Sequence, residues 1–407
     1  MPWNVTAISP SANRNFNMWS FFRPLLFKLD PETAHHLTLQ LIRLGAYQPL
    51  NLLLRAMYTA PGKPVEAFGL HFPNPVGLAA GYDKDGLAWR GLATLGFGHI
   101  EIGTVTPRPQ PGNPKPRVFR LVEDRAVINR MGFPGLGADY VASRLRGSPG
   151  SSTGRGSPGS STGRGSPGSS VVVPVPARDG VVPVPARGTG RRRTLSRCSF
   201  GNDRQVIVGV NLGKNKDTPL ENAASDYITL MRQFTPLADY LAINVSSPNT
   251  VGLRRLQGRE MLEGLLGAIA KERENIAAGR GGRAPILVKL APDLSDEELD
   301  DALEVILRTG MDGVIATNTT LGRAGLRSNR REETGGLSGE PLRVRSEAVL
   351  RSVVKKLDGR LPVVSVGGIM RPEDARARLD AGAALVQVYT GLVYAGPGLV
   401  KQIVQKL

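Results

Sequence analysis

Eight short apolar runs recur along the chain of 407 residues, and they constrain its fold more than any other feature. The runs are continuous rather than alternating with polar residues, which indicates strands buried on both faces, as in parallel sheets. The stretches between them are long enough for helices. Eight strands alternating with helices predict an α/β fold, the (β/α)8 or TIM barrel. The predicted strands lie at 75–81, 99–105, 206–212, 240–246, 285–292, 313–319, 362–368 and 384–391.

Two of the stretches between strands carry clear helix signals. Residues 295–310 begin with a serine N-cap and acidic residues, continue with an apolar stripe, and end in glycine. Residues 371–383 show a shorter pattern of the same kind.

Each predicted strand ends in polar or glycine-rich sequence. The endings read AAGYDKDG, GTVTP, NLGKNK, NVSSPNT, KLAPD, TNTT, VGGI and YTG. A turn alone would explain serine, proline and asparagine in NVSSPNT. In a (β/α)8 barrel, however, the C-terminal ends of all strands meet on one face, where barrel enzymes have their active sites. Eight polar endings on one face therefore favour a functional site.

Glycines and two lysines indicate what this face binds. Gly367, Gly368 and Gly391 allow backbone N–H groups to approach a ligand, as at barrel phosphate sites, although a Gly-Gly pair also suits a tight turn. Lys289 lies within an apolar run and needs an anion, which is either a structural carboxylate or an electron-rich cofactor such as a reduced flavin. Lys84 is either a solvated loop lysine or a partner for a substrate carboxylate.

Five asparagines lie on or near the same face. Each side chain offers one acceptor and two donors, which suits a flat ring with alternating C=O and N–H edges. They are Asn129, Asn211, Asn244, Asn249 and Asn318. No Cys/His cluster has metal-ligand spacing, so no metal site is predicted.

Residues 147–205 differ from the rest of the chain. GSPGSSTGR occurs at 147–155 and 156–164, and VVPVPAR at 172–178 and 181–187. This composition predicts a disordered, low-complexity insertion before the third strand. Its nine arginines supply much of the net charge of +17, so nucleic-acid binding is not expected of the rest. The only cysteine, Cys198, lies here, so no internal disulfide forms and a reducing cytoplasmic setting fits.

The segment from Trp19 to Met57 is rich in large apolar residues interrupted by Arg and Lys. No run reaches the ~18 apolar residues of a spanning helix. Asp30 as N-cap and Pro31 at the first helical position begin the second of two predicted amphipathic helices. Such a pair is expected to lie on a membrane surface, or to be a helical cap packed on the barrel.

Several long motifs now give a specific resemblance. They are NPVGLAAGYDKDG, GFGHIEIGTVTPRPQPGNPKPRVFRL, VINRMGF, GVNLGKNK, NVSSPNTVGLRRLQG, TGGLSG and LVQVYTG. The chain resembles the dihydroorotate dehydrogenases, most closely the membrane-associated, quinone-dependent class, from Trp19 to Leu407 except for the insertion. One departure is Pro134, where many members of the family carry asparagine, so one polar contact near the substrate is not expected here.

The resemblance implies oxidation of dihydroorotate to orotate with FMN, the redox step of pyrimidine synthesis. Ser247 would take the C5 proton and pass it to water through a threonine or a bound water, and the C6 hydride would go to flavin N5. Members of the soluble class carry cysteine at the position of Ser247. The implied substrate residues are Lys84, Asn129, Arg130, Met131, Gly132, Phe133, Asn244, Asn249, Asn318 and Thr319. The implied FMN residues are Ala80, Gly81, Thr104, Asn211, Asn244, Lys289, Thr317, Gly339, Gly368, Tyr389 and Thr390.

The resemblance also implies a division of the chain and a location. Residues 1–18 would be a flexible N-terminus, 19–60 a helical membrane and quinone-tunnel subdomain, and 61–407 the FMN barrel. His35, Arg120 and Tyr389 match the polar positions of the tunnel. A peripheral enzyme on the cytoplasmic face of a bacterial inner membrane is expected. The alternatives are the soluble class that uses fumarate or NAD, and a non-catalytic membrane adaptor or RNA-binding module on an inactive barrel.

Overall fold

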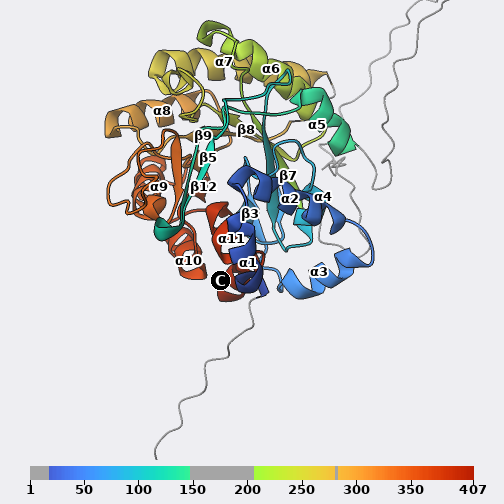
Figure 1. Cartoon of the computed structure of the whole chain (residues 1–407). Helices are drawn as coiled ribbons and strands as arrows, with labels where there is room; N and C mark the ends of the chain where they lie inside the picture. Colours follow the sequence, from blue (N-terminus) through green and yellow to red (C-terminus); the bar gives the residue numbers. More distant parts are fainter. Residues whose placement is uncertain (1–17, 147–205, 280–282) are drawn as a thin grey trace, which may run out of the picture.

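The eight predicted strands form a closed barrel in the computed structural model, which describes residues 18–146, 206–279 and 283–407 (Figure 1). Neighbouring strands pair in parallel in the order β10-β12-β13-β3-β4-β7-β8-β9. The prediction of a (β/α)8 barrel is confirmed. Its strands are β3 (Val76–Leu78), β4 (His99–Val105), β7 (Ile207–Leu212), β8 (Tyr240–Asn244), β9 (Ile286–Leu290), β10 (Gly313–Ala316), β12 (Val363–Val366) and β13 (Leu385–Val388).

Helices surround the barrel and bury their apolar stripes against the strands (Figure 1). The predicted serine cap is present, because Ser295 and Glu298 form a capping box at the start of α8. The helices are α4 (Trp89–Ala93), α5 (Gly137–Arg146), α6 (Ala223–Phe234), α7 (Arg259–Ala278), α8 (Asp296–Arg308), α9 (Arg343–Leu357), α10 (Pro372–Asp380), α11 (Thr390–Ala395) and α12 (Gly398–Lys406). Short 3-10 helices lie at Val122–Asp124, Leu220–Asn222, Leu253–Gln257 and Glu340–Leu342.

The described residues 18–60 contain three helices, so the prediction of two was wrong. They are α1 (Met18–Lys28), α2 (Pro31–Leu44) and α3 (Leu50–Tyr58). Asp30 caps α2 as predicted, since its carboxylate accepts the N–H groups of Glu32 and Thr33 at 3.0 Å each. The chain leaves the helix at Gly45, and Pro49, which has no N–H to donate, precedes the separate helix α3.

These three helices pack on the barrel and leave an apolar outer face. The Trp19 indole and the Arg23 guanidinium both donate to the Tyr394 carbonyl of α11, at 3.2 and 3.0 Å. A Cβ at Gly91 of α4 would lie 1.8 Å from the Ile42 carbonyl oxygen, so α2 and α4 are in close contact. We call the outer face the apolar surface of α1–α3. Its exposed side chains are Phe21, Phe22, Leu25, Leu29, Leu37, Leu41, Leu44, Tyr47, Leu50, Leu52, Leu53 and Met57.

Two small antiparallel sheets were not predicted. A hairpin of β1 (Val65–Ala67) and β2 (Leu70–Phe72) places Phe72 in a buried cluster with residues of the barrel strands. A second sheet has the order β11-β6-β5, with β5 (Val118–Leu121), β6 (Ala126–Asn129) and β11 (Gly336–Gly339). Its residues help to enclose the functional face described below.

The predicted insertion itself lies outside the described residues. Its two ends are described: α5 ends at Arg146 and β7 begins at Ile207. The segment therefore joins a helix to the N-terminal end of a barrel strand, which is the end opposite to the functional face.

Candidate active site

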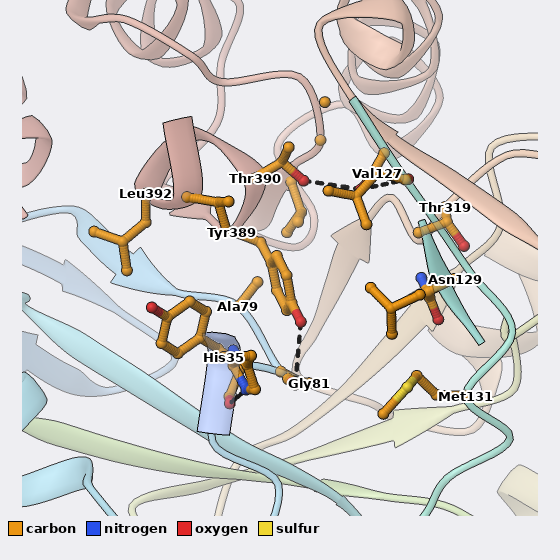
Figure 2. A pocket seen from close by; sticks show the side chains of 18 of the residues that line it. His35, Ala79, Gly81, Val127, Asn129, Met131, Thr319, Tyr389, Thr390 and Leu392 are labelled. Atoms are coloured by element: carbon orange, nitrogen blue, oxygen red, sulfur yellow. Dashed lines mark hydrogen bonds between the residues drawn. The ribbon is translucent and has the colours of Figure 1, made fainter. Parts of the chain in front are cut away.

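A cavity lies at the C-terminal ends of the barrel strands, as the strand endings predicted (Figure 2). Its walls come from the strand ends, from the sheet β11-β6-β5, and from α1 and α2. Strand-end residues include Gly81, Thr104, Asn244, Lys289, Thr317, Gly368 and Tyr389. Trp19, Leu26, Phe27 and Pro31 contribute from the N-terminal helices, and Val118, Val127 and Ser338 from the sheet.

Most of the residues assigned by resemblance line this one cavity. Of the described residues that line it, the assigned ones are Ser247, Lys84, Asn129, Met131, Gly132, Phe133, Asn244, Asn249, Asn318, Thr319, Ala80, Gly81, Thr104, Lys289, Thr317, Gly339, Gly368, Tyr389, Thr390, His35 and Arg120. Segments from His35 to Thr390 are thus brought together by the fold. Arg130, Asn211 and Pro134 do not line it.

Arg130 points elsewhere because it has partners outside the cavity. Its guanidinium forms an ion pair with Glu333 at 2.7 Å and lies over the Phe119 ring, 4.5 Å from the centroid. The assignment of its side chain to the substrate is not supported by this geometry. Arg130 directly follows Asn129, the last residue of β6, and only the Asn129 side chain is directed to the cavity.

Asn211 lies beneath the lining residues and holds them. Its Oδ1 accepts hydrogen bonds from Thr104 Oγ1 at 2.6 Å and from Asn244 Nδ2 at 3.0 Å. Its Nδ2 donates to Glu101 at 2.8 Å. Asn211 is therefore a positioning residue in this structure.

Lys289 faces both the cavity and a buried carboxylate. Its Nζ lies 3.8 Å from Glu101 Oε1, so the structural ion pair that the sequence left open is present. Burial lowers the pKa of Lys289, and Glu101 opposes that shift. Tyr240, Gln387 and Asn211 also donate to the Glu101 carboxylate, at 3.1, 2.8 and 2.8 Å. Glu101 was not among the predicted site residues, although a charged residue within the apolar run HIEIGTV is the same signal that marks Lys289.

Lys84 lies in a loop that a buried aspartate fixes. Asp83 accepts the N–H groups of Leu87 and Ala88 at 2.7 and 2.8 Å. Burial raises the pKa of Asp83 to about 6. Burial also lowers the pKa of Lys84, while Asp85 and Glu32 raise it. An ammonium held in the cavity wall in this way suits an anionic ligand group.

The asparagines converge around Ser247. Asn249 donates from Nδ2 to Asn129 at 3.1 Å, and Asn318 donates to Ser246 at 2.9 Å. Among the described residues, the one hydrogen bond to the Ser247 hydroxyl is long, 3.3 Å from the Asn249 N–H. This leaves Ser247 free to interact with a ligand in the cavity.

Three buried polar atoms near the cavity have no partner among the described residues. They are Asn249 Oδ1, Thr250 Oγ1 and Gln387 Oε1. Asn249 and Gln387 line the cavity, and Thr250 directly follows Asn249. Buried polar atoms are costly unless they are hydrogen-bonded, so this arrangement requires a polar ligand or ordered water.

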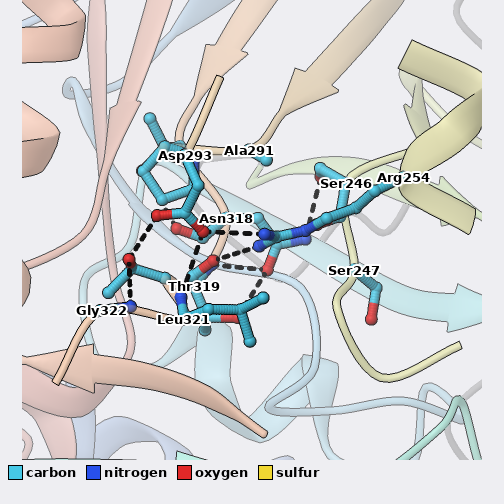
Figure 3. A network of polar contacts seen from close by, with 12 residues as sticks. Ser246, Ser247, Arg254, Ala291, Asp293, Asn318, Thr319, Leu321 and Gly322 are labelled. Carbon is cyan, nitrogen blue, oxygen red and sulfur yellow. Dashed lines mark hydrogen bonds and ion pairs between the residues drawn. The ribbon is translucent and has the colours of Figure 1, made fainter. Parts of the chain in front are cut away.

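An arginine fixes the loop that carries Ser247 (Figure 3). Arg254 donates to the Ser246 carbonyl at 3.1 Å, to Asp293 at 2.8 Å and to the Thr319 carbonyl at 2.8 Å. These partners belong to the loops after β8, β9 and β10. Nothing in the local sequence around Arg254 indicates its contacts with Asp293 and Thr319, because these two partners are 39 and 65 residues away along the chain.

The three predicted tunnel residues line the cavity, and Figure 2 shows two of them, His35 and Tyr389. His35 of α2 donates to the Tyr82 carbonyl at 2.8 Å, and Tyr82 has edge-on ring contacts with both His35 and Tyr389. Burial lowers the pKa of His35 to about 3, so the ring is neutral. Arg120 donates to the Leu26 carbonyl of α1 at 3.3 Å and lies over the Phe27 ring. The contacts join the strand ends to α1 and α2.

No group of three His, Cys, Asp or Glu side chains in the described ranges is placed to hold a metal ion. The cavity instead offers amides, a serine hydroxyl, two lysines and glycine backbone. This set suits an organic ligand with hydrogen-bonding ring edges and negative groups.

Comparison with known proteins agrees with this geometry. A family model described as dihydroorotate dehydrogenase matches residues 64–407. A protein of Azotobacter vinelandii named dihydroorotate dehydrogenase (quinone) is 44% identical over 391 residues, 96% of each chain. A protein of the same name from Pseudomonas fluorescens strain SBW25 is 43% identical over 96% of this chain and 98% of its own length.

A solved structure is also similar along almost the whole chain. The crystal structure of the DHODH of Eimeria tenella in complex with ferulenol has 37% sequence identity and a TM-score of 0.75, and the match covers 94% of this chain and 93% of that one. Family model, relatives and solved structure therefore agree, and this chain belongs to the dihydroorotate dehydrogenase family.

Proposed function

We propose that this chain oxidises dihydroorotate to orotate with FMN and passes the electrons to a membrane quinone. The relatives named above carry the name dihydroorotate dehydrogenase (quinone). The observation that supports the proposal most directly is a single cavity that contains Ser247, the asparagines and Lys289 and also reaches the apolar helices α1 and α2. One cavity can thus serve a polar substrate and an apolar electron acceptor.

Ser247 is the proposed base. Oxidation removes a proton from C5 and a hydride from C6 and forms the C5=C6 double bond. The Ser247 hydroxyl would take the C5 proton as it releases its own proton to the relay. The buried Thr250 hydroxyl, which has no partner among the described residues, would help to pass that proton to water. Asn129, Asn249 and Asn318 would hold the ring amides, and Lys84 the carboxylate.

The cavity fits a flavin on the side of the strand ends. FMN, when bound, would accept the C6 hydride as a two-electron acceptor. Glycine is needed at Gly339 and Gly368, because a Cβ would lie 2.4 Å from the Arg125 carbonyl oxygen and 2.2 Å from Arg343 Cα. Gln387 Oε1 offers an unpaired acceptor, and Lys289 a cation for the electron-rich edge of the ring. The other proposed contacts are Ala80, Gly81, Thr104, Asn244, Thr317, Tyr389 and Thr390.

Residues 19–60 are the proposed route for the quinone. In the described part of the chain, no helix has the length and apolar character needed to cross a membrane. The apolar surface of α1–α3 is instead suited to contact the surface of a lipid bilayer. His35, Arg120 and Tyr389 would then provide the polar positions along the passage from that surface to the flavin. A peripheral position on the cytoplasmic face of the cell inner membrane fits this proposal.

An anaerobic titration tests the proposal. The purified protein is expected to show a flavin spectrum that bleaches on addition of dihydroorotate and returns with a short-chain ubiquinone. Reoxidation by fumarate or NAD instead would contradict the quinone assignment. A flavin that dihydroorotate cannot bleach would contradict the substrate, and a protein that binds no FMN would contradict the cofactor.

A further inference from the structure

Arg378 of α10 is a buried cation that does not itself line the cavity. Its side chain is fully buried, with an exposed fraction of 0%. Burial lowers the pKa of Arg378 to about 10, and Glu347 and Asp374 oppose the shift, so the guanidinium remains charged near neutral pH. A buried charge is costly, and its position therefore needs an explanation.

The guanidinium lies directly behind the wall of the cavity. Nη2 of Arg378 is 3.1 Å from the Gly367 carbonyl oxygen, 2.9 Å from Ser346 Oγ and 2.7 Å from the Arg343 carbonyl oxygen. Ser346 also donates to the Gly367 carbonyl at 2.8 Å. Gly367 and Gly368 both line the cavity, so one peptide group separates the cation from it.

These contacts fix the direction of that peptide group. In a trans peptide bond, the C=O of Gly367 and the N–H of Gly368 point in opposite directions. Because Arg378 and Ser346 hold the carbonyl, the Gly368 N–H points away from them, to the cavity side of the turn. Gly367 and Gly368 have positive φ, +111° and +72°. A Cβ at Gly368 would lie 2.2 Å from Arg343 Cα, so no other residue fits there. The turn is thus held in a conformation that presents a backbone donor to a ligand.

The positive charge of Arg378 is only partly neutralised. Its closest carboxylate, Glu347 Oε2, is 3.9 Å from Nε, which makes no hydrogen bond. Glu347 also pairs with Arg351 at 2.8 Å, and Asp374 accepts the N–H groups of Met370 and Arg371. A charge in a low-dielectric region acts strongly on an anion nearby. A neutral side chain could donate hydrogen bonds to the same carbonyl groups but would not attract an anion.

We propose that Arg378 is a positioning residue for a phosphate group: it orients the Gly367–Gly368 turn and supplies positive charge from behind it. The inference rests on the proposed function, because the phosphate would be that of FMN. It predicts that Arg378 contributes to binding of the phosphate and not of the flavin ring.

FMN and riboflavin differ only in the phosphate. Comparing their binding therefore distinguishes a role of Arg378 in phosphate binding from a general role in the stability of the fold. The full-length chain, freed of flavin, is titrated with each, and the Kd is followed by flavin fluorescence. Arg378→Met is expected to raise the Kd for FMN about 10-fold or more and that for riboflavin less than about 2-fold. Arg378→Lys, which keeps the charge, is expected to raise the FMN Kd less than Arg378→Met does.

Arg376→Met is the matched control on the same helix. Arg376 is half-exposed and pairs with Asp380 at 2.9 Å, so its loss is expected to leave both Kd values unchanged. The inference is overturned if Arg378→Met changes both Kd values by the same factor or changes neither. If Arg378→Met does not fold, Arg378→Gln, which removes the charge but keeps a hydrogen-bond donor, takes its place, and an unchanged ratio of FMN to riboflavin Kd in that variant overturns the inference. A wild-type chain that does not bind FMN contradicts the proposed cofactor itself.

Discussion

At the scale of single residues, the cavity is held by polar side chains that each join two or three strands. Asn211 connects Thr104, Asn244 and Glu101, and Arg254 connects the loops after β8, β9 and β10. Because these side chains are already fixed before a ligand binds, the reacting groups do not have to be ordered during binding. Ser247, by contrast, has one long hydrogen bond.

Replacement of Ser247 by alanine is expected to slow the reduction of the flavin by dihydroorotate about 100- to 10,000-fold, because the proposed base is removed. The visible flavin spectrum is expected to remain. Stopped-flow bleaching measures the rate. Ser225→Ala, at an exposed serine of α6 that bonds the Asn222 carbonyl, is the control and should react like the wild type. A Ser247→Ala variant with an unchanged rate would show that another group takes the proton.

Replacement of Glu101 by glutamine is expected to lower the free energy of unfolding by about 3 kcal/mol, because it leaves Lys289 buried without its carboxylate. Urea denaturation measures the loss. Glu66→Gln is the control, since Glu66 is exposed and 3.8 Å from His71 at the surface, and it should cost little. Equal effects of the two substitutions would mean that Glu101 does not compensate Lys289.

At the scale of elements, the N-terminal helices have two different faces. The inner face packs on α4 and α11, and the outer face exposes most of the large apolar side chains found on the surface of the described residues. An exposed apolar surface of this extent marks an interaction site.

The double substitution Phe21→Glu/Leu25→Glu on α1 is expected to reduce binding to lipid vesicles about 10-fold or more, since both exposed side chains become charged. Vesicle sedimentation measures the binding. The reduction of flavin by dihydroorotate is expected to stay unchanged, because neither side chain lines the cavity. Val344→Glu on α9 removes another exposed apolar residue and is the control. Equal loss of binding in both variants would contradict a membrane role for α1.

The elements also show how far the sequence predicts this structure. The barrel strands were found because burial on both faces leaves a continuous apolar signal. The sheet β11-β6-β5 was not predicted, because β5 alternates buried with partly buried residues and β11 reads GLSG, so neither strand leaves a continuous apolar run. The motifs also predicted most of the residues that line the cavity. They did not predict the direction of the Arg130 side chain or the hydrogen bonds of Arg254 to the loops after β9 and β10, because these depend on contacts remote in sequence.

At the scale of the whole molecule, stability depends on pH through buried histidines. Burial lowers the pKa of His99 to about 3, and the same holds for His35. An unfolded chain binds a proton at each histidine near pH 6.5, so stability present above that pH is lost as the pH falls toward 3. Asp83 acts in the opposite direction, because its raised pKa adds stability as the pH falls through about 6.

When the pH is lowered from about 7.5 to about 5, the free energy of unfolding is expected to fall by about 2 kcal/mol less in His99→Gln than in the wild type. The reason is that the variant lacks the fully buried ring. Urea denaturation at both pH values measures the difference. His71→Gln, at an exposed histidine, should follow the wild type. A His99→Gln variant with the wild-type pH dependence would mean that His99 is protonated in the folded protein.

Deletion of residues 148–203 is expected to leave flavin content and turnover within about 2-fold of the wild type. The reason is the position of the flanking elements: the segment leaves α5 and enters the end of β7 that is remote from the cavity. Absorbance at the flavin band and steady-state rates measure both quantities. A loss of flavin or of folding would contradict the prediction.

The contact between α1 and α11 has a consequence for the order of events during synthesis. Trp19 and Arg23 bind the carbonyl of Tyr394, and the barrel closes only when β13 pairs with β3. Helix α1 therefore cannot complete this contact until almost the last strand of the barrel is made. Throughout translation its apolar side chains are available to a bilayer or a chaperone, so an encounter with the membrane can precede completion of the enzyme.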